Sequence, residues 1–189
     1  MKIAVISGST RRGRMTPNIA HFITKALKNH DLITEVILLD IAKYDFPVMK
    51  ERLQYLENPP EGMKEFSQYL IESDGIIIVS PEYNGSFPGS LKNTLDYFYK
   101  EYGKKPIGIV TVSAGKFSGV NMSHDLLKLI LKVRAFPLPT TLMIGEVNKA
   151  VDELGNVIDE RFIKSSKRFI LDFIWFTEAI MRQKNKPLN

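Results

Sequence analysis

The fold is decided by residues 80–93, which read Ser80-Pro81-Glu82-Tyr83-Asn84-Gly85-Ser86-Phe87-Pro88-Gly89-Ser90-Leu91-Lys92-Asn93. They follow Gly75-Ile76-Ile77-Ile78-Val79, a β-branched run typical of a buried parallel strand. Two prolines and two glycines within nine residues prevent regular structure before the next helix. A strand-to-helix connection normally needs only about 2–6 residues. This longer one is therefore either a ligand-binding loop at the carboxyl end of a strand or an ordinary surface loop.

Strand-like and helix-like segments alternate five times along the chain. We predict strands over residues 2–7, 34–39, 75–79, 105–112 and 140–144, and helices over 17–29, 61–72, 91–99, 120–134 and 159–181. This alternation predicts an α/β three-layer sandwich with a five-stranded parallel sheet covered on both faces. Right-handed connections and five strand–helix units favour the flavodoxin-like strand order 2-1-3-4-5 over the six-stranded dinucleotide fold. We expect one domain over residues 1–189.

Composition restricts the partners of this domain. No apolar run approaches about 18 residues, so we expect no membrane span. The chain has no Cys, which excludes disulfides and thiolate ligands and fits a cytoplasmic location. Its formal net charge is +5, which raises nucleic acid as a partner, but the basic residues are dispersed among acidic ones. We therefore expect no nucleic-acid partner.

The first predicted strand ends in a polar loop, residues 8–18, that has the chemistry of an anion site. It contains two glycines, three small hydroxyl residues, one Asn and three Arg. Pro17 suits the first turn of the following helix, and Thr16 is the candidate N-cap. The N–H groups of a helix start, together with hydroxyls and guanidinium groups, favour an anion. The alternative is a solvated basic turn.

The spacing of this loop excludes two common phosphate motifs. A dinucleotide fingerprint needs Gly-x-Gly, whereas Thr10 follows Gly8-Ser9. A nucleotide-triphosphatase loop needs Lys and Ser or Thr after its second glycine, whereas Arg14 follows Gly13. The loop therefore suits one terminal phosphomonoester.

The ligand attached to that phosphate is indicated by two further loops. In the order 2-1-3-4-5 the first, third and fourth strands are adjacent, and the switch point lies between the first and third. A phosphate at the first loop would leave the rest of its ligand over the third and fourth loops. The fourth loop, residues 113–119, is again rich in glycine and hydroxyl groups. A phosphate at one end and a flat, backbone-lined slot at the other describe a mononucleotide such as FMN.

These residues resemble a known family. Gly8-Ser9-Thr10-Arg11 with Thr16 and Asn18, and Pro81-Glu82-Tyr83-Asn84 running into Leu91-Lys92-Asn93, are similar to motifs of the NADPH-dependent FMN reductase family, which includes quinone, chromate and azo-dye reductases. The resemblance implies non-covalent FMN, NADPH or NADH as electron donor, and a homodimer or homotetramer. It also implies transfer of two electrons to a small acceptor such as free flavin, a quinone, an azo dye or a metal oxyanion.

The resemblance also implies cofactor-binding residues in each loop. The first loop would hold the FMN phosphate through Ser9, Arg11, Thr16, Pro17 and Asn18. The third-strand loop would border the flavin ring through Pro81, Glu82, Tyr83, Asn84 and Gly85, and the fourth would cover its other edge through Ser113 and Gly115. Two segments depart from the family: Gly13-Arg14-Met15, where many members have a small Ser, and Ala114-Gly115, where many have two glycines.

We expect no catalytic side chain, because the flavin itself carries the redox chemistry. Glu82 is interpreted as a loop carboxylate facing solvent or a neighbouring N–H group rather than a general base. Tyr83 either stacks near the ring or packs against a partner subunit. The three His residues lack the spacing of metal ligands.

Two other functions compete with the reductase. One is a flavodoxin-type electron-transfer or regulatory flavoprotein without NAD(P)H turnover of its own, and the other is a phosphate-recognising module that binds no flavin. Flavodoxin-type carriers are usually acidic, whereas this chain is basic, which favours an enzyme. The predicted last helix is apolar nearly all round at residues 169–176, which favours a homo-oligomer.

Overall fold

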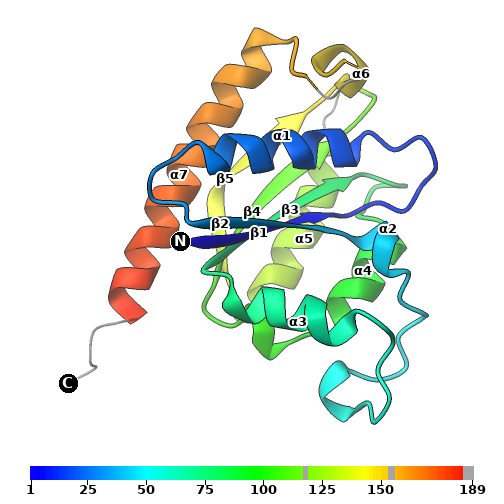
Figure 1. Ribbon diagram of the computed structural model, residues 1–189. Coiled ribbons are helices and arrows are strands. Elements are labelled where there is room, and N and C mark those ends of the chain that lie inside the picture. Colours follow the sequence, from blue (N-terminus) through cyan, green and yellow to red (C-terminus); the bar gives the residue numbers. More distant parts are fainter. Residues whose placement is uncertain (117–118, 153–155, 185–189) are drawn as a thin grey trace.

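The computed structural model describes residues 1–116, 119–152 and 156–184, and this part of the chain contains one parallel β-sheet. Its five strands are β1 (Lys2–Ser7), β2 (Glu35–Asp40), β3 (Gly75–Pro81), β4 (Pro106–Val112) and β5 (Phe136–Ile144). They are ordered β2-β1-β3-β4-β5, and every neighbouring pair is parallel (Figure 1). The predicted strand order is confirmed.

Helices cover both faces of this sheet, so the predicted three layers are confirmed. The first face carries α1 (Thr16–Lys28) and α7 (Glu160–Lys184), and the second carries α3 (Met63–Glu72), α4 (Gly89–Asp96) and α5 (Val120–Lys132). The connections also contain α2 (Ile41–Tyr44), α6 (Val147–Ala150) and the 3₁₀ turns η1 (Leu53–Tyr55) and η2 (Lys100–Tyr102). No helix in the described ranges is long and apolar enough to cross a membrane.

Two apolar cores follow from the alternation of side chains along each strand. Val5 of β1 and Val79 of β3 point toward α1 and α7, where they meet Phe173 among others. Their chain neighbours Ile6 and Ile78 point to the opposite side and pack with α3, α4 and α5. Because both faces are buried, the strands are apolar without interruption, which is the pattern that made them recognisable in the sequence.

The predicted start of the last strand is wrong. β5 begins at Phe136 rather than at residue 140, and it includes Pro137 and Pro139. It lies at the edge of the sheet, where proline is tolerated because one side of the strand has no partner. The N–H of Phe136 donates to Lys105 O (2.8 Å), so the nitrogen of the next residue, Pro137, faces away from β4.

Lys105 lies just before β4, at the amino end of the sheet. Its Nζ donates hydrogen bonds to the carbonyl oxygens of Leu70, Ile71 and Ser73, at 2.5, 2.6 and 2.6 Å. Cations at a helix C-terminus interact favourably with its unpaired carbonyl groups, so Lys105 fastens the end of α3 to the sheet. Burial lowers the pKa of this ammonium group to about 8, and the nearby Lys184 acts in the same direction.

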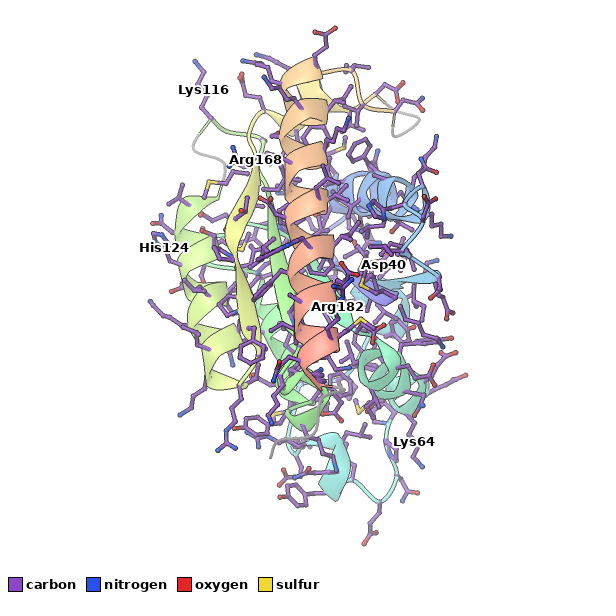
Figure 2. All side chains as sticks on the ribbon, turned by 90° about the vertical axis from the view of Figure 1, so that its left-hand side faces the viewer. Asp40, Lys64, Lys116, His124, Arg168 and Arg182 are labelled. Carbon is purple, nitrogen blue, oxygen red and sulfur yellow. The ribbon has the colours of Figure 1, made fainter. Side chains whose placement is uncertain are left out.

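The long helix α7 exposes large apolar side chains. Figure 2 looks onto this helix, with β5 and α5 on one side of it and α1 on the other. Phe169 and Phe173 are buried against the sheet, whereas Ile163, Leu171 and Trp175 are exposed, and Trp175 is 69% exposed. The helix is therefore apolar on more than the face that the sheet covers.

Candidate functional site

A cleft of about 420 Å³ opens at the carboxyl ends of β1, β3 and β4. Its walls come from the three loops predicted to bind a ligand and from α6. The lining residues are Arg11, Gly13, Arg14, Met15, Thr16, Pro81, Glu82, Tyr83, Val112, Ser113, Ala114, Gly115, Val147 and Asn148. This is the switch point of the sheet, where open α/β folds bind their ligands.

The start of α1 lies at one end of the cleft without a side-chain cap. The N-cap is Met15, which has no capping hydrogen bond among the described residues, and Pro17 lies in the first turn. The interpretation of Thr16 as the N-cap is therefore wrong: it is the first helical residue, and it is buried in the cleft wall. Uncapped N–H groups at a helix start are available to an anion.

Two arginines line the same end of the cleft but differ in their contacts. The guanidinium group of Arg11 is exposed and has no partner among the described residues. Arg14 turns inward, and its Nη1 donates to the carbonyl oxygen of Ser9 while its Nη2 pairs with Asp40 Oδ2 at 2.7 Å. Of these two arginines, Arg11 is thus the one whose guanidinium group has no partner in the described chain and can meet a ligand.

The third-strand loop is a tight hairpin. Tyr83 and Ser86 exchange both backbone hydrogen bonds, at 2.8 and 3.2 Å, and the residues between them, Asn84 and Gly85, have φ of 52° and 83°. Two positive φ angles in a two-residue loop define a type I′ turn, for which Asn-Gly is a preferred sequence. The hydroxyl oxygens of Tyr83 and Ser9 lie 2.9 Å apart and share a hydrogen bond, which joins this hairpin to the first loop.

Glu82 ties the same loop to α5. Its Oε2 accepts a hydrogen bond from the backbone N–H of Met122 at 3.1 Å, in the first turn of that helix. A carboxylate at this place satisfies one of the unpaired N–H groups of the helix start. Of the two surroundings expected for this carboxylate, solvent or a neighbouring N–H group, the structure shows the N–H group.

The fourth-strand loop is braced by its own hydroxyl group and by α6. Gly115 N donates to Ser113 Oγ at 3.0 Å, and Val147 N donates to Ser113 O at 3.0 Å. The backbone N–H of Glu146 donates to Gly115 O at 3.2 Å. These bonds hold Ser113 and Gly115 at the edge of the cleft. Residues 117–118 of this loop lie outside the described residues.

Seven of the twelve predicted cofactor-binding residues line the cleft: Arg11, Thr16, Pro81, Glu82, Tyr83, Ser113 and Gly115. The other five lie beside it. Ser9 is buried beneath the first loop, Pro17 and Asn18 lie in the first turn of α1, and Asn84 and Gly85 form the exposed tip of the hairpin.

The sequence interpretation missed Asp40 and α6 as parts of this site. Asp40 ends β2 and reaches the first loop through Arg14, a contact between residues 26 positions apart. Val147 and Asn148 bring α6 to the cleft wall. The Gly13-Arg14-Met15 segment stood out in the sequence as a departure from the family, but nothing in it identified Asp40 or α6 as its partners.

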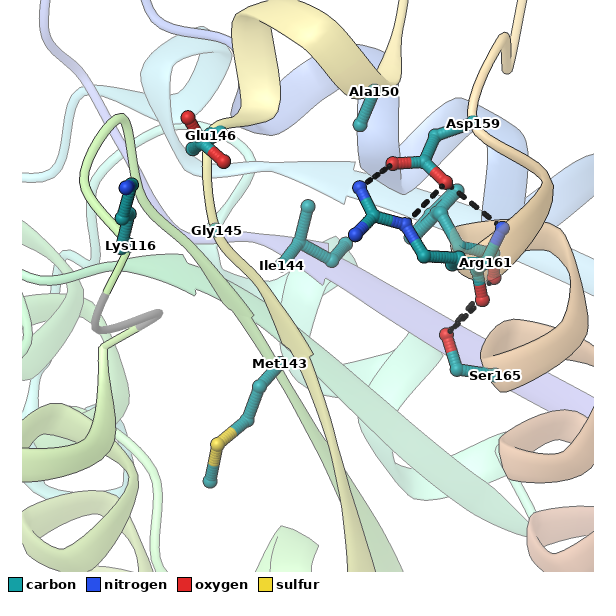
Figure 3. A pocket seen from close by; sticks show the side chains of 10 residues that line it. Lys116, Met143, Ile144, Gly145, Glu146, Ala150, Asp159, Arg161 and Ser165 are labelled. Atoms are coloured by element: carbon teal, nitrogen blue, oxygen red, sulfur yellow. Dashed lines mark hydrogen bonds and ion pairs between the residues drawn. The ribbon is translucent and has the colours of Figure 1, made fainter.

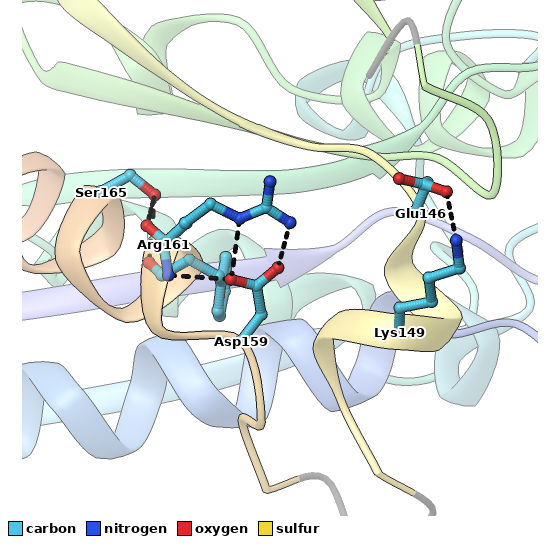
Figure 4. Close-up of polar contacts among 6 residues, drawn as sticks. Glu146, Lys149, Asp159, Arg161 and Ser165 are labelled. Carbon is cyan, nitrogen blue, oxygen red and sulfur yellow. Dashed lines mark hydrogen bonds and ion pairs between the residues drawn. The ribbon is translucent and has the colours of Figure 1, made fainter.

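A second cleft of about 380 Å³ adjoins the first at the carboxyl end of β5 (Figure 3). Arg161 lines it but is paired with Asp159 at 3.0 Å, and Glu146, another lining residue, is paired with Lys149 at 2.6 Å (Figure 4). Arg161 and Lys149 thus have carboxylate partners, and Lys116, which also lines this cleft, is not free either. The exposed guanidinium group of Arg11 therefore makes the first cleft the better anion site.

Comparison with known proteins identifies the family of this chain. Residues 1–149 match the family model described as NADPH-dependent FMN reductase. The NAD(P)H-dependent FMN reductase ntnL of Nectria sp is 31% identical over 181 residues, which cover 88% of this chain and 90% of the relative. An FMN-dependent NADPH-azoreductase of Staphylococcus aureus is 27% identical over 182 residues, covering 93% and 95%.

Solved structures agree on the fold. The flavoenzyme NAD(P)H:(acceptor) oxidoreductase FerB of Paracoccus denitrificans superposes with a TM-score of 0.78 at 24% identity, covering 94% of this chain and 97% of that one. Oxidised flavodoxin 1 of Bacillus cereus gives a TM-score of 0.59 at 14% identity, covering 93% and 98%. The flavodoxin-like fold is therefore confirmed. The match over residues 1–149 shows that this chain belongs to the NADPH-dependent FMN reductase family and is an oxidoreductase, as its motifs predicted.

Proposed function

We propose that this chain binds FMN in the cleft at the carboxyl ends of β1, β3 and β4, and passes two electrons from NAD(P)H to a small acceptor. One observation carries the proposal: the exposed guanidinium group of Arg11 and the uncapped start of α1 share one cleft with the third-strand and fourth-strand loops. When bound, FMN supplies the redox chemistry, because its ring accepts two electrons and gives them up again.

The donors at the first loop fit a terminal phosphate. A phosphate dianion is bound best by charged donors together with the N–H groups of a helix start. Arg11 supplies the charge, and the first turn of α1 supplies N–H groups that no side chain caps in the described chain. The hydroxyl group of Thr16 lies on the same wall. The volume of about 420 Å³ lies in the range of about 300–1,000 Å³ usual for small-molecule pockets.

The hairpin after β3 offers backbone donors for the polar edge of the ring. The N–H of Tyr83 is bonded within the hairpin and that of Gly115 is bonded to Ser113 Oγ. The N–H groups of Asn84 and Gly85 have no acceptor within the described residues. Both residues lie beside the cleft rather than in its lining, so a flavin ring that extends over the hairpin would meet these free donors, which would stabilise negative charge on the reduced ring. We propose that Asn84 and Gly85 act through these backbone groups rather than through side chains.

The competing functions are an electron carrier without NAD(P)H turnover and a phosphate-binding module without flavin. Family membership and the basic charge of the chain both favour the enzyme over the carrier. The relatives ntnL and the Staphylococcus aureus azoreductase are named for NAD(P)H-dependent activity. We therefore propose NADPH or NADH as the electron donor, and a free flavin, quinone, azo dye or metal oxyanion as the class of acceptor.

The test is an anaerobic stopped-flow reduction of the purified chain after saturation with FMN. We expect the protein to be yellow, to retain FMN through gel filtration, and to lose its flavin absorbance when it is mixed with NADPH or NADH. Dithionite serves as the control that the bound flavin is reducible. A protein that takes up no FMN would exclude this cofactor site. If dithionite reduces the bound flavin and neither NADPH nor NADH does, the result would support the electron carrier instead.

A further inference from the structure

We propose that Arg14 is a positioning residue, which Asp40 holds in place so that it shapes the first loop around the phosphate. This inference rests on the proposed FMN site and deepens it. It separates the two arginines of the cleft wall: Arg11 binds the anion, and Arg14 holds the backbone that presents it. Charge alone would not distinguish them, because both are cationic and both line the cleft.

The contacts of Arg14 close the first loop upon itself. Its Nη1 donates to the carbonyl oxygen of Ser9, five residues earlier in the chain, and its Nη2 is bonded to Asp40 at the end of β2. In the described chain the loop has few other ties: Gly8 N donates to Val79 O at 2.8 Å, Arg11 N donates to Ser9 Oγ at 3.4 Å, and the Ser9 and Tyr83 hydroxyls share a hydrogen bond. A planar guanidinium group can serve two acceptors in fixed directions at once. Arg14 therefore fixes the segment that carries Arg11.

The pair is placed for structure rather than for ligand charge. The side chains of Arg14 and Asp40 are only 18% and 10% exposed. A carboxylate this close to an anion site would repel a phosphate unless a cation neutralised it. Asp40 also accepts from Ala42 N at 3.3 Å, where it caps α2. Asp40 is thus fixed at both of its oxygens, and it gives Arg14 a rigid point of attachment on the sheet.

A hydrogen bond also joins the phosphate loop to the ring loop. Ser9, whose carbonyl group Arg14 holds, shares its hydroxyl hydrogen bond with Tyr83 of the hairpin. A continuous series of contacts therefore runs from β2 through the first loop to the hairpin after β3: Asp40, Arg14, Ser9, Tyr83. Order that is present before a ligand binds lowers the entropy lost on binding. Loss of the Arg14–Asp40 pair should therefore lower the affinity for FMN, even in a variant that removes the negative charge of Asp40 from the neighbourhood of the phosphate.

The sign of the Asp40→Asn effect tests this idea. If charge dominates, removal of a carboxylate beside the phosphate tightens FMN. If positioning dominates, Asp40→Asn weakens FMN about 10-fold, the size of one lost charge-assisted hydrogen bond. Asparagine keeps the shape of Asp40 and an oxygen that can cap α2. Asp45→Asn is the matched control, because Asp45 is an exposed acid just after α2 that lies outside the cleft lining.

Arg14→Lys provides a second, independent variant. It keeps the positive charge but loses the planar fork that serves Ser9 O and Asp40 together, so we expect the same loss of about 10-fold in FMN affinity. The readout is the ratio of FMN to riboflavin affinity, from fluorescence titration of each apoprotein. General destabilisation would weaken both ligands and leave this ratio unchanged, whereas a disturbed phosphate loop lowers it.

The outcomes separate this inference from the proposed function. Wild-type apoprotein that fails to bind FMN would refute the proposed site itself. If the wild-type protein binds FMN, and Asp40→Asn or Arg14→Lys binds it equally well or more tightly, the positioning role alone is overturned. An FMN-to-riboflavin ratio lowered about 10-fold in both variants and unchanged in Asp45→Asn supports it.

Discussion

Removal of the Arg11 side chain should weaken FMN without weakening riboflavin, which has the same ring and no phosphate. Arg11 has an exposed guanidinium group without a partner in the described chain, so Arg11→Ala breaks no contact of the apoprotein. The loss is then one hydrogen bond to a charged group, about 1.5–3 kcal/mol. At about 1.4 kcal/mol per decade, FMN affinity should fall on the order of 10- to 100-fold. Because Arg11 is exposed to solvent, we expect the lower end.

The neighbouring Arg12 provides the control for long-range charge. It is exposed like Arg11 but does not line the cleft, so Arg12→Ala removes the same charge without removing the contact. Exposed charges interact by only about 0–1 kcal/mol, so its effect on FMN should stay below about 5-fold. The assay is fluorescence titration of apoprotein with FMN and riboflavin at about 0.15 M salt, where the Debye length is about 8 Å. Equal weakening of both ligands by Arg11→Ala would refute a phosphate at the first loop.

Three further predictions concern the hairpin, the buried ammonium group and the exposed face of α7. Gly85→Val should lower FMN affinity about 10-fold, because a left-handed backbone conformation costs a residue with a Cβ about 1–2 kcal/mol. Gly89→Ala is the control in the same titration, since its added Cβ would meet no atom within 4 Å. The pKa of Lys105 is about 8 in the folded chain, below its value in the unfolded chain. Between these two pKa values the unfolded chain binds more protons, so folding stability should rise with pH above about 8. Urea unfolding of wild type and Lys105→Met at pH 7.5 and 9.5 tests this, and a stability difference that does not change with pH contradicts it. The exposed Leu171 and Trp175 predict a homodimer or larger assembly, and light scattering at micromolar concentration that returns one chain's mass of 21.5 kDa would rule it out.

The sequence predicted the fold well because the strands are buried on both sides. Segments such as residues 75–79 are apolar without a break, and the loops between segments divide the chain into five strand–helix units. Because connections between parallel strands are right-handed, few strand orders are possible. The errors lie where tertiary position overrides a local signal. Pro137 and Pro139 suggested a later strand start, but an edge strand tolerates them. Thr16 has the chemistry of an N-cap, yet the helix begins at Thr16 itself and its cap is Met15.

The candidate site was predictable as a set of loops and not as a network. The Asn84-Gly85 pair predicts a turn from its own residues, because the required backbone conformation is local. The contact of Arg14 with Asp40 and that of Glu82 with Met122 N join residues 26 and 40 positions apart. Such pairs depend on which strands become neighbours and on how side chains settle between them. No periodicity or motif along the chain contains that information.

The prolines of β5 also limit how copies of this chain can assemble. A free sheet edge normally recruits another strand through its outward N–H and C=O groups. Pro137 faces outward without an N–H, since its neighbour Phe136 donates inward to Lys105. A ladder of backbone hydrogen bonds across two molecules would therefore be interrupted at the beginning of this strand. If the chain dimerises as predicted, we expect the β5 edges to stay unpaired and helices to meet through their side chains, and the same prolines disfavour aggregation of the folding chain through this edge.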